Sequence, residues 1–175
     1  MTSESAIEAA LSRLTDEAAV EEAMVAFATE QAPFVQYLRT DTFSLLTEDE
    51  RDYLQYLALV VYAAVADERE RVPTLRGEAI EEWEERCWGW LEASVGKPMS
   101  ARLDAFFDNI DEEELLAFAE DSLVDPEPEE QPEAALFASG PSRELGIVAL
   151  AVLIGGLTAA QRERSRPVPR PGRGA

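Results

Sequence analysis

The chain has 175 residues, 46% of them hydrophobic, which is the composition of a folded globular protein and excludes global disorder. Its 36 acidic and 15 basic residues give a formal net charge of −21, and an acidic surface of this kind repels nucleic-acid backbones. Histidine is absent and Cys87 is the single cysteine, which excludes imidazole catalysis, thiolate zinc sites and an intramolecular disulfide.

The charge is unevenly distributed along the chain. Residues 141–175 carry six arginines and two glutamates, so the first 140 residues hold a net charge of −25. Among the basic residues there is one lysine, Lys97. Such a composition is typical of proteins from salt-accumulating cells, and it also follows from a GC-rich genome combined with selection for solubility.

The first 40 residues predict two helices and a break. One short helix is expected over Glu4 to Leu14, and Thr15 is expected to cap a second helix whose apolar residues recur at helical spacing. Pro33 then breaks the chain or begins a new helical turn.

The clearest element in the sequence begins at Thr47. Thr47 and Glu50 have the spacing of a capping box. From Tyr53 to Ala66 the only strongly polar side chain is Gln55. A helix that is apolar on nearly all faces is predicted to be central and surrounded by others.

Three further helices are expected in the middle of the chain. Thr74 is a candidate cap for the first, "SARLDAFFDNI" forms the second, and Asp111 with Glu114 predicts a second capping box before the third. Residues 125–133, "DPEPEEQPE", hold three prolines and five acids and predict an acidic linker. Ser142 is then expected to cap the last helix.

The last apolar run, Leu145 to Ala160, raises the question of a membrane span. Its sixteen uncharged residues fall short of the roughly 20 that a span needs. The arginines that follow would also have to cross the membrane, against the positive-inside rule. We therefore expect a buried core helix and no membrane partner. Its small residues Ala151, Gly155 and Ala159 lie four apart and predict close packing against the Tyr53 to Ala66 helix.

These elements predict an all-α fold. We expect one domain over residues 1–160, a bundle of about six to eight helices with the two strongly apolar helices as its central pair. Residues 161–175, rich in arginine and proline, are expected to form a disordered tail. RNA, an anionic membrane and an acidic surface, including the chain's own domain, all suit the charge of this tail; it offers no aromatic residue for base stacking.

Carboxylates are the main groups left for chemistry. Glu78, Glu81, Glu82 and Glu85 share part of a helix face and could bind Mg²⁺ or Mn²⁺, but a solvated acidic face is the simpler interpretation. The sequence shows no phosphate-binding loop and no dinucleotide fingerprint. We therefore predict no catalytic residue, no metal site and no cofactor.

All three tryptophans lie in the stretch "WEERCWGW". Trp83 and Trp90 share the apolar face of a helix with Cys87, so these residues are expected in the core and the thiol is expected to be inert. Trp88 lies at the edge of that face. Because tryptophan is enriched at interface hot spots, Trp88, with Trp83 and Trp90 beside it, is the candidate partner interface, and the alternative is a broad buried face.

Three functions remain open for this sequence. The leading hypothesis is a non-enzymatic protein–protein interaction module, whose partner is another protein or a second copy of the chain. The alternatives are an acidic nucleic-acid mimic that occupies a DNA-binding protein, and an enzyme that uses Mg²⁺ or Mn²⁺ held by carboxylates alone. The first residues have no basic start and no apolar run of signal-peptide length, so we expect a cytoplasmic protein.

The acidity predicts that stability rises with salt. Repulsion among the acidic residues of the first 140 positions acts over a Debye length of about 10 Å at 0.1 M salt and is screened as salt increases. We expect the midpoint of thermal unfolding to rise from low to molar NaCl, as measured by circular dichroism. A flat or falling midpoint would contradict this electrostatic argument.

Overall fold

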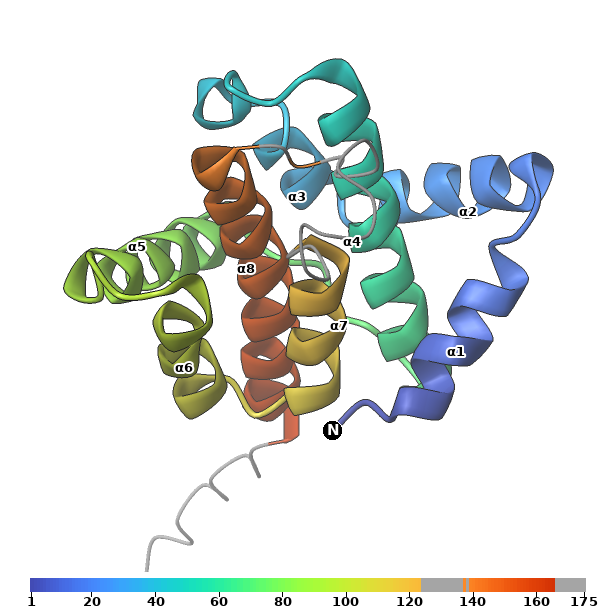
Figure 1. Cartoon of the computed structure of the whole chain (residues 1–175). Helices are drawn as coiled ribbons and strands as arrows, with labels where there is room; N and C mark the ends of the chain where they lie inside the picture. Colours follow the sequence, from blue (N-terminus) through green and yellow to red (C-terminus); the bar gives the residue numbers. More distant parts are fainter. Residues whose placement is uncertain (124–136, 138, 166–175) are drawn as a thin grey trace, which may run out of the picture.

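The computed structural model describes residues 1–123, 137 and 139–165, and within these residues the fold is an all-α bundle of eight helices (Figure 1). The prediction of an all-α bundle of six to eight helices is confirmed. The elements are α1 (Glu4–Arg13), α2 (Glu17–Glu30), α3 (Ala32–Tyr37), the 3₁₀ turn η1 (Asp41–Phe43), α4 (Glu48–Glu68), α5 (Gly77–Ala93), α6 (Met99–Asn109), α7 (Glu113–Leu123) and α8 (Gly140–Ser165).

The capping box predicted at the start of α4 is present. The Thr47 side chain accepts a hydrogen bond from the Glu50 backbone N–H at 3.2 Å, and the Glu50 carboxylate accepts one from the Thr47 N–H at 2.8 Å. Both ends of this motif satisfy backbone donors that the first helical turn leaves without partners. The motif therefore sets where α4 begins.

Two predicted caps are wrong by one to three residues. Asp16, rather than Thr15, caps α2, and its carboxylate accepts from the Ala19 N–H at 2.9 Å. Ser139, rather than Ser142, lies at the start of α8, where its hydroxyl accepts from the Ser142 N–H at 3.1 Å. In each case nearby residues have side chains that can cap; at α2 the capping residue, Asp16, has extended backbone, as capping residues typically do.

The second predicted capping box is also wrong. α7 begins at Glu113, two residues after Asp111. The Asp111 carboxylate accepts a hydrogen bond from Arg162 of α8 instead. A local sequence pattern could not predict this ion pair, because Arg162 is far from Asp111 along the chain.

α8 occupies the middle of the bundle. Every residue from Leu145 to Leu157 is buried. α5 and α7 form its most extensive contacts, and α4 packs along it as well. Figure 1 shows α5 and α6 on one side of α8, and α4, α1 and α2 on the other. The expected central pair therefore exists, but α8 packs more extensively on α5 than on α4.

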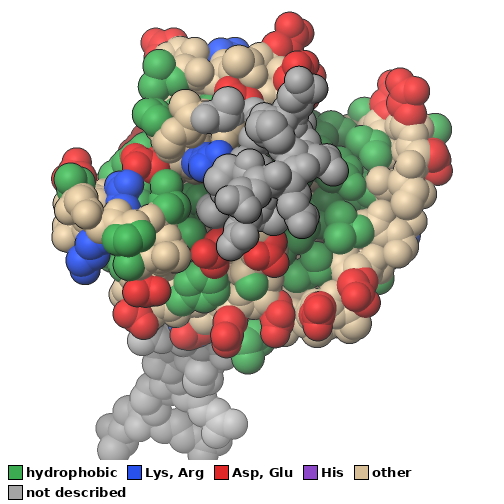
Figure 2. Space-filling model, viewed as in Figure 1, with side chains coloured by type: hydrophobic (Ala, Val, Ile, Leu, Met, Phe, Trp, Pro, Cys, Tyr) green, Lys and Arg blue, Asp and Glu red, His purple; other side chains and the backbone are tan. Residues whose placement is uncertain are grey.

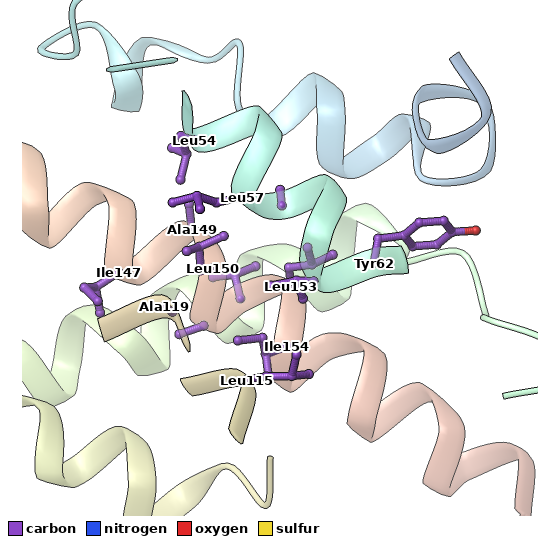
Figure 3. Packing of buried hydrophobic residues seen from close by; sticks show 14 of the residues in the cluster. Leu54, Leu57, Tyr62, Leu115, Ala119, Ile147, Ala149, Leu150, Leu153 and Ile154 are labelled. Atoms are coloured by element: carbon purple, nitrogen blue, oxygen red, sulfur yellow. The ribbon is translucent and has the colours of Figure 1, made fainter. Parts of the chain in front are cut away.

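Leucine-rich layers join α4, α7 and α8. Figure 3 shows Leu57 of α4 close to Leu150 of α8, with Leu54 one turn earlier on α4 and with Leu115 of α7 beside Ile154. All five side chains are at most 2% exposed. By length and composition α8 could also cross a membrane, and 72% of its apolar window is buried inside the protein.

α8 continues to Ser165, five residues past the end of its apolar run at Ala160. Residues 161–165, expected in the tail, are thus helical. The predicted acidic linker at 125–133 and the remainder of the tail, 166–175, lie outside the described residues.

The buried carboxylate of Glu112 and its partner Arg69 link four parts of the chain: the N-terminus, the end of α4, the start of α7 and α8. Glu112, just before α7, has a side chain that is 2% exposed, and it accepts hydrogen bonds from the Thr2 backbone N–H at 2.6 Å and from Arg69 at 2.7 Å. Arg69, at the end of α4, also donates to the Leu157 carbonyl of α8 at 3.4 Å. A buried charge needs such a partner because its desolvation is otherwise uncompensated.

Gln31 is a second buried polar group, and it holds the loop that precedes α5. Its side-chain amide donates to the Pro73 carbonyl at 2.9 Å and accepts from the Leu75 N–H at 3.0 Å. Gln31 is fully buried between α2 and α3. This pair of bonds holds the loop that leads into α5 against the α2–α3 junction.

Removing the closer of the two cations beside Glu112 should destabilise the fold. Arg69→Met leaves the buried carboxylate with only the N-terminal ammonium at 3.9 Å, and we expect the free energy of unfolding to fall by about 3 kcal/mol, the lower end of the range for a broken buried pair. Arg71→Met, at an exposed position in the same loop, is the control and should change it by less than about 0.5 kcal/mol. Denaturant unfolding compares the two variants, and equal midpoints would contradict the role given to the Arg69–Glu112 pair.

Candidate partner-binding site

α5 carries all three tryptophans and begins later than expected. Its first residue is Gly77, and the residue before it, Arg76, has extended backbone and makes no side-chain capping bond, so the predicted cap at Thr74 is wrong. The buried face of the helix is formed by Ile80, Cys87 and Leu91. This is the face that the helical spacing predicts.

The structure places all three tryptophans against the core. All three are half-buried and packed against the hydrophobic core. The Trp90 ring lies edge-on to Phe106 of α6, with 5.3 Å between ring centroids, and edge-on to Trp83 at 6.4 Å. The sequence left Trp88 without an internal role, but its side chain also packs against the core.

Trp83 lies directly on the backbone of α8 at Gly155. A methyl group added at Gly155 would come within 2.6 Å of the Trp83 ring, closer than van der Waals contact allows. The sequence correctly marks Gly155 as a point of close approach, but the neighbour is α5 and not α4. A bulky ring and a residue without a side chain fit together at this crossing.

Arg86 lies over the Trp83 ring. The guanidinium carbon is 5.2 Å from the centre of the Trp83 ring, within the range of a cation–π contact. Arg86 also forms an ion pair with Glu82, one turn earlier on α5. The Trp83 ring thus contacts α8 at Gly155, Trp90 of its own helix and Arg86.

Two hollows flank Trp83 and share it as a wall. The first, which we call the Glu78 hollow, has a volume of about 160 Å³ and lies between Glu78 and Glu82 of α5 and Gly156 and Ala160 of α8. The second, the Arg162 hollow, has a volume of about 290 Å³ and lies between Arg86, the end of α6 and Arg162 of α8. Ala159 and Glu163 line both hollows. We call Trp83 with its two hollows the Trp83 groove.

The groove contains charges of both signs in an otherwise acidic protein. Arg76 lines the Glu78 hollow together with three glutamates, and Arg86 and Arg162 line the Arg162 hollow together with Asp111 and Glu163. The side chains of Arg162 and Asp111, which pair with each other, are 64% and 69% exposed. Exposed pairs of this kind are weak, so their charges stay available to a partner.

Cys87 lies one turn after Trp83 on the apolar face of α5 and is fully buried. Burial, together with the nearby Glu84 carboxylate, raises the pKa of the Cys87 thiol to about 12. At neutral pH it is a thiol rather than the nucleophilic thiolate, in line with the expectation of an inert side chain. Glu84 itself accepts a hydrogen bond from the Tyr37 hydroxyl at 3.1 Å.

The acidic side chains do not converge on a metal site in the described part of the chain, where no group of three or more potential ligands is found. The candidates Glu78, Glu81, Glu82 and Glu85 are all exposed. Figure 2 shows aspartate and glutamate side chains spread around the outline of the visible face, over several helices.

A larger hollow lies elsewhere, between the α3–η1 connection and the first turns of α4. Its volume is about 530 Å³ and its lining includes Arg39, Asp41, Arg51 and Asp52. All four of these side chains are exposed. The hollow is therefore a polar surface depression, without the apolar lining and enclosed polar groups of a typical small-molecule site.

No protein-family model, curated protein or solved structure matches this chain.

The contact between Trp83 and Gly155 generates a stability prediction. Gly155→Ala gains about 1 kcal/mol of helix propensity, but it forces the Trp83 ring to move, so we expect a net loss of about 1–2 kcal/mol and a change in tryptophan fluorescence. Gly89→Ala, in the middle of α5 with nothing within 4 Å of the added methyl group, is the control and should stabilise the protein by about 0.5–1 kcal/mol. If both substitutions stabilise the protein, the close contact between Trp83 and Gly155 is contradicted.

Proposed function

We propose that this protein is a non-enzymatic, cytoplasmic binding protein and that the Trp83 groove is where it holds a protein partner. The observation that carries the proposal is a half-buried tryptophan seated on a glycine and flanked by hollows of about 160 and 290 Å³. Tryptophan beside a pocket is a frequent arrangement at the energetic centre of protein interfaces.

The groove is preorganised for binding. Trp83 is supported by Gly155 beneath it, by Trp90 at its edge and by Arg86 over its ring, so little side-chain entropy is lost when a partner contacts it. The floor consists of small residues of α8, Gly156, Ala159 and Ala160, which leave room for a side chain from outside. A rigid aromatic residue beside a shallow apolar floor suits a protein surface.

The chemistry of the groove supports binding over catalysis. Its titratable groups are arginines and carboxylates that are partly or largely solvent-exposed, and no histidine exists in the chain. Catalytic acids and bases require pKa values moved toward neutrality by burial or by close like charges. The arginine–carboxylate pairs of the groove suit the polar rim of an interface, which is commonly solvent-accessible.

Filling the groove should abolish partner capture while leaving the fold intact. Ala159 is half-buried and lines both hollows, so Ala159→Gln places a larger side chain across the groove without removing a core residue. Ala18→Gln, at an exposed position on α2, is the matched control. Each of the three proteins is immobilised on a resin and incubated with an extract of cells of the native source, at the salt concentration found in those cells. We expect the wild type and Ala18→Gln to retain a protein that Ala159→Gln loses.

Thermal unfolding checks that Ala159→Gln remains folded. If the three baits retain the same proteins in the same amounts, the Trp83 groove is not the binding surface.

A further inference from the structure

We infer that the partner held in the Trp83 groove binds through a basic segment, and that a lysine or arginine side chain of this segment enters the Glu78 hollow between Glu78 and Glu163. This inference rests on the proposed function and names the chemistry of the partner. It follows from the charges of the groove that have no counter-ion.

The charged side chains of the groove leave one negative charge in excess. Two ion pairs already use four of them: Arg86 with Glu82, and Arg162 with Asp111. The three others, which all line the Glu78 hollow, are Arg76, Glu78 and Glu163. None of these three has an ion pair or a side-chain hydrogen bond among the described residues. The unbalanced charge of the groove therefore lies in the Glu78 hollow.

Glu163 has no structural role that explains its place. It lies in the last turn of α8, where the helix dipole disfavours a negative charge, whereas Glu78 lies in the first turn of α5, where the dipole favours one. The residues three and four positions before Glu163 are Ala160 and Ala159, which offer no charge to pair with it. Glu163 is therefore the carboxylate of the groove that gains most from a cation brought by a partner.

The Glu78 hollow has the size and the lining for a lysine side chain. Its volume of about 160 Å³ equals that of about five water molecules, and a lysine side chain has a similar number of non-hydrogen atoms. Gly156, Ala159 and Ala160 provide apolar surface for the methylene groups of the stem. Glu78 and Glu163 are exposed, so the charged end can stay in contact with water beside them.

The rest of the chain favours the same chemistry. The first 140 residues carry a net charge of −25, which draws a basic segment toward the protein and repels an acidic one. This attraction acts on any basic molecule. Specific binding therefore depends on direct contact with the hollow, and the controls below keep the two effects apart.

Selection from a peptide library shows which side chains the hollow prefers. A phage-displayed library of random peptides is selected on the full chain, and peptides that also bind Ala159→Gln are removed. Ala159→Gln fills the groove without changing the charge of the protein. We expect the retained peptides to carry lysine or arginine at one shared position at least about threefold more often than the starting library does.

A retained peptide is then measured against charge variants of the full chain by fluorescence anisotropy. Glu163→Gln and Glu78→Gln should each weaken its binding at least about fivefold. Glu81→Gln, at an exposed position of α5 that lines neither hollow, removes the same charge and should change binding by less than about twofold. Replacing the shared basic residue of the peptide by glutamine should weaken binding to the wild type about tenfold, but binding to Glu163→Gln only about twofold.

A shared basic residue whose effect is lost in Glu163→Gln supports the inference, provided that circular dichroism shows every variant to be folded. Retained peptides with acidic or apolar anchors, or equal effects of Glu81→Gln and Glu163→Gln, overturn it and leave the groove as the binding surface. Peptides recovered only with a chain that ends at Ser165, or self-association that Ala159→Gln abolishes, identify the chain's own tail or a second copy as the occupant and also overturn it. If no selected peptide distinguishes the wild type from Ala159→Gln, the proposed function fails as well.

Discussion

The enclosure of α8 is the constraint on which the rest of the fold depends. Its residues from Leu145 to Leu157 present apolar side chains or glycine in every direction, so the helix has no face that can be left in water at low cost. α4, α5 and α7 pack around it, and each of these helices presents a buried stripe. The outer helices α1, α2, α3 and α6 then cover parts of that first layer.

The Trp83 groove lies where this enclosure ends. Thr158 to Gln161 of α8 are half-buried and Arg162 to Arg164 are exposed, and the small residues of this last part of the helix lie beside Trp83 of α5. The same glycine that lets α5 approach α8 therefore also positions the tryptophan at the edge of the core. Stability and the candidate site are coupled at this crossing, because a substitution at Gly155 moves the residue that a partner would contact.

Local sequence patterns predicted the helices well, because the features that form a helix lie within a few residues of one another along the chain. The Thr47–Glu50 box and the apolar run of α8 were readable in this way. The caps at Thr15 and Ser142 were misplaced because Asp16 and Ser139, which are nearby, also have side chains that accept hydrogen bonds from backbone N–H groups. Of the candidate site, the sequence indicated the tryptophans and Gly155 but not their contact.

The sequence by itself determined the helical class, the need to bury α8 and the acidity of the surface, since hydrophobic periodicity and residue charge are properties of the chain alone. Only the tertiary structure decided that Gly155 receives a tryptophan of α5 rather than a residue of α4, because that choice depends on which helix reaches α8 at that level. The same holds for Arg162, which lies nearly 80 residues from Trp83 along the chain, yet lines the same hollow. Its place depends on how α8 crosses α5, and no local pattern carries that geometry.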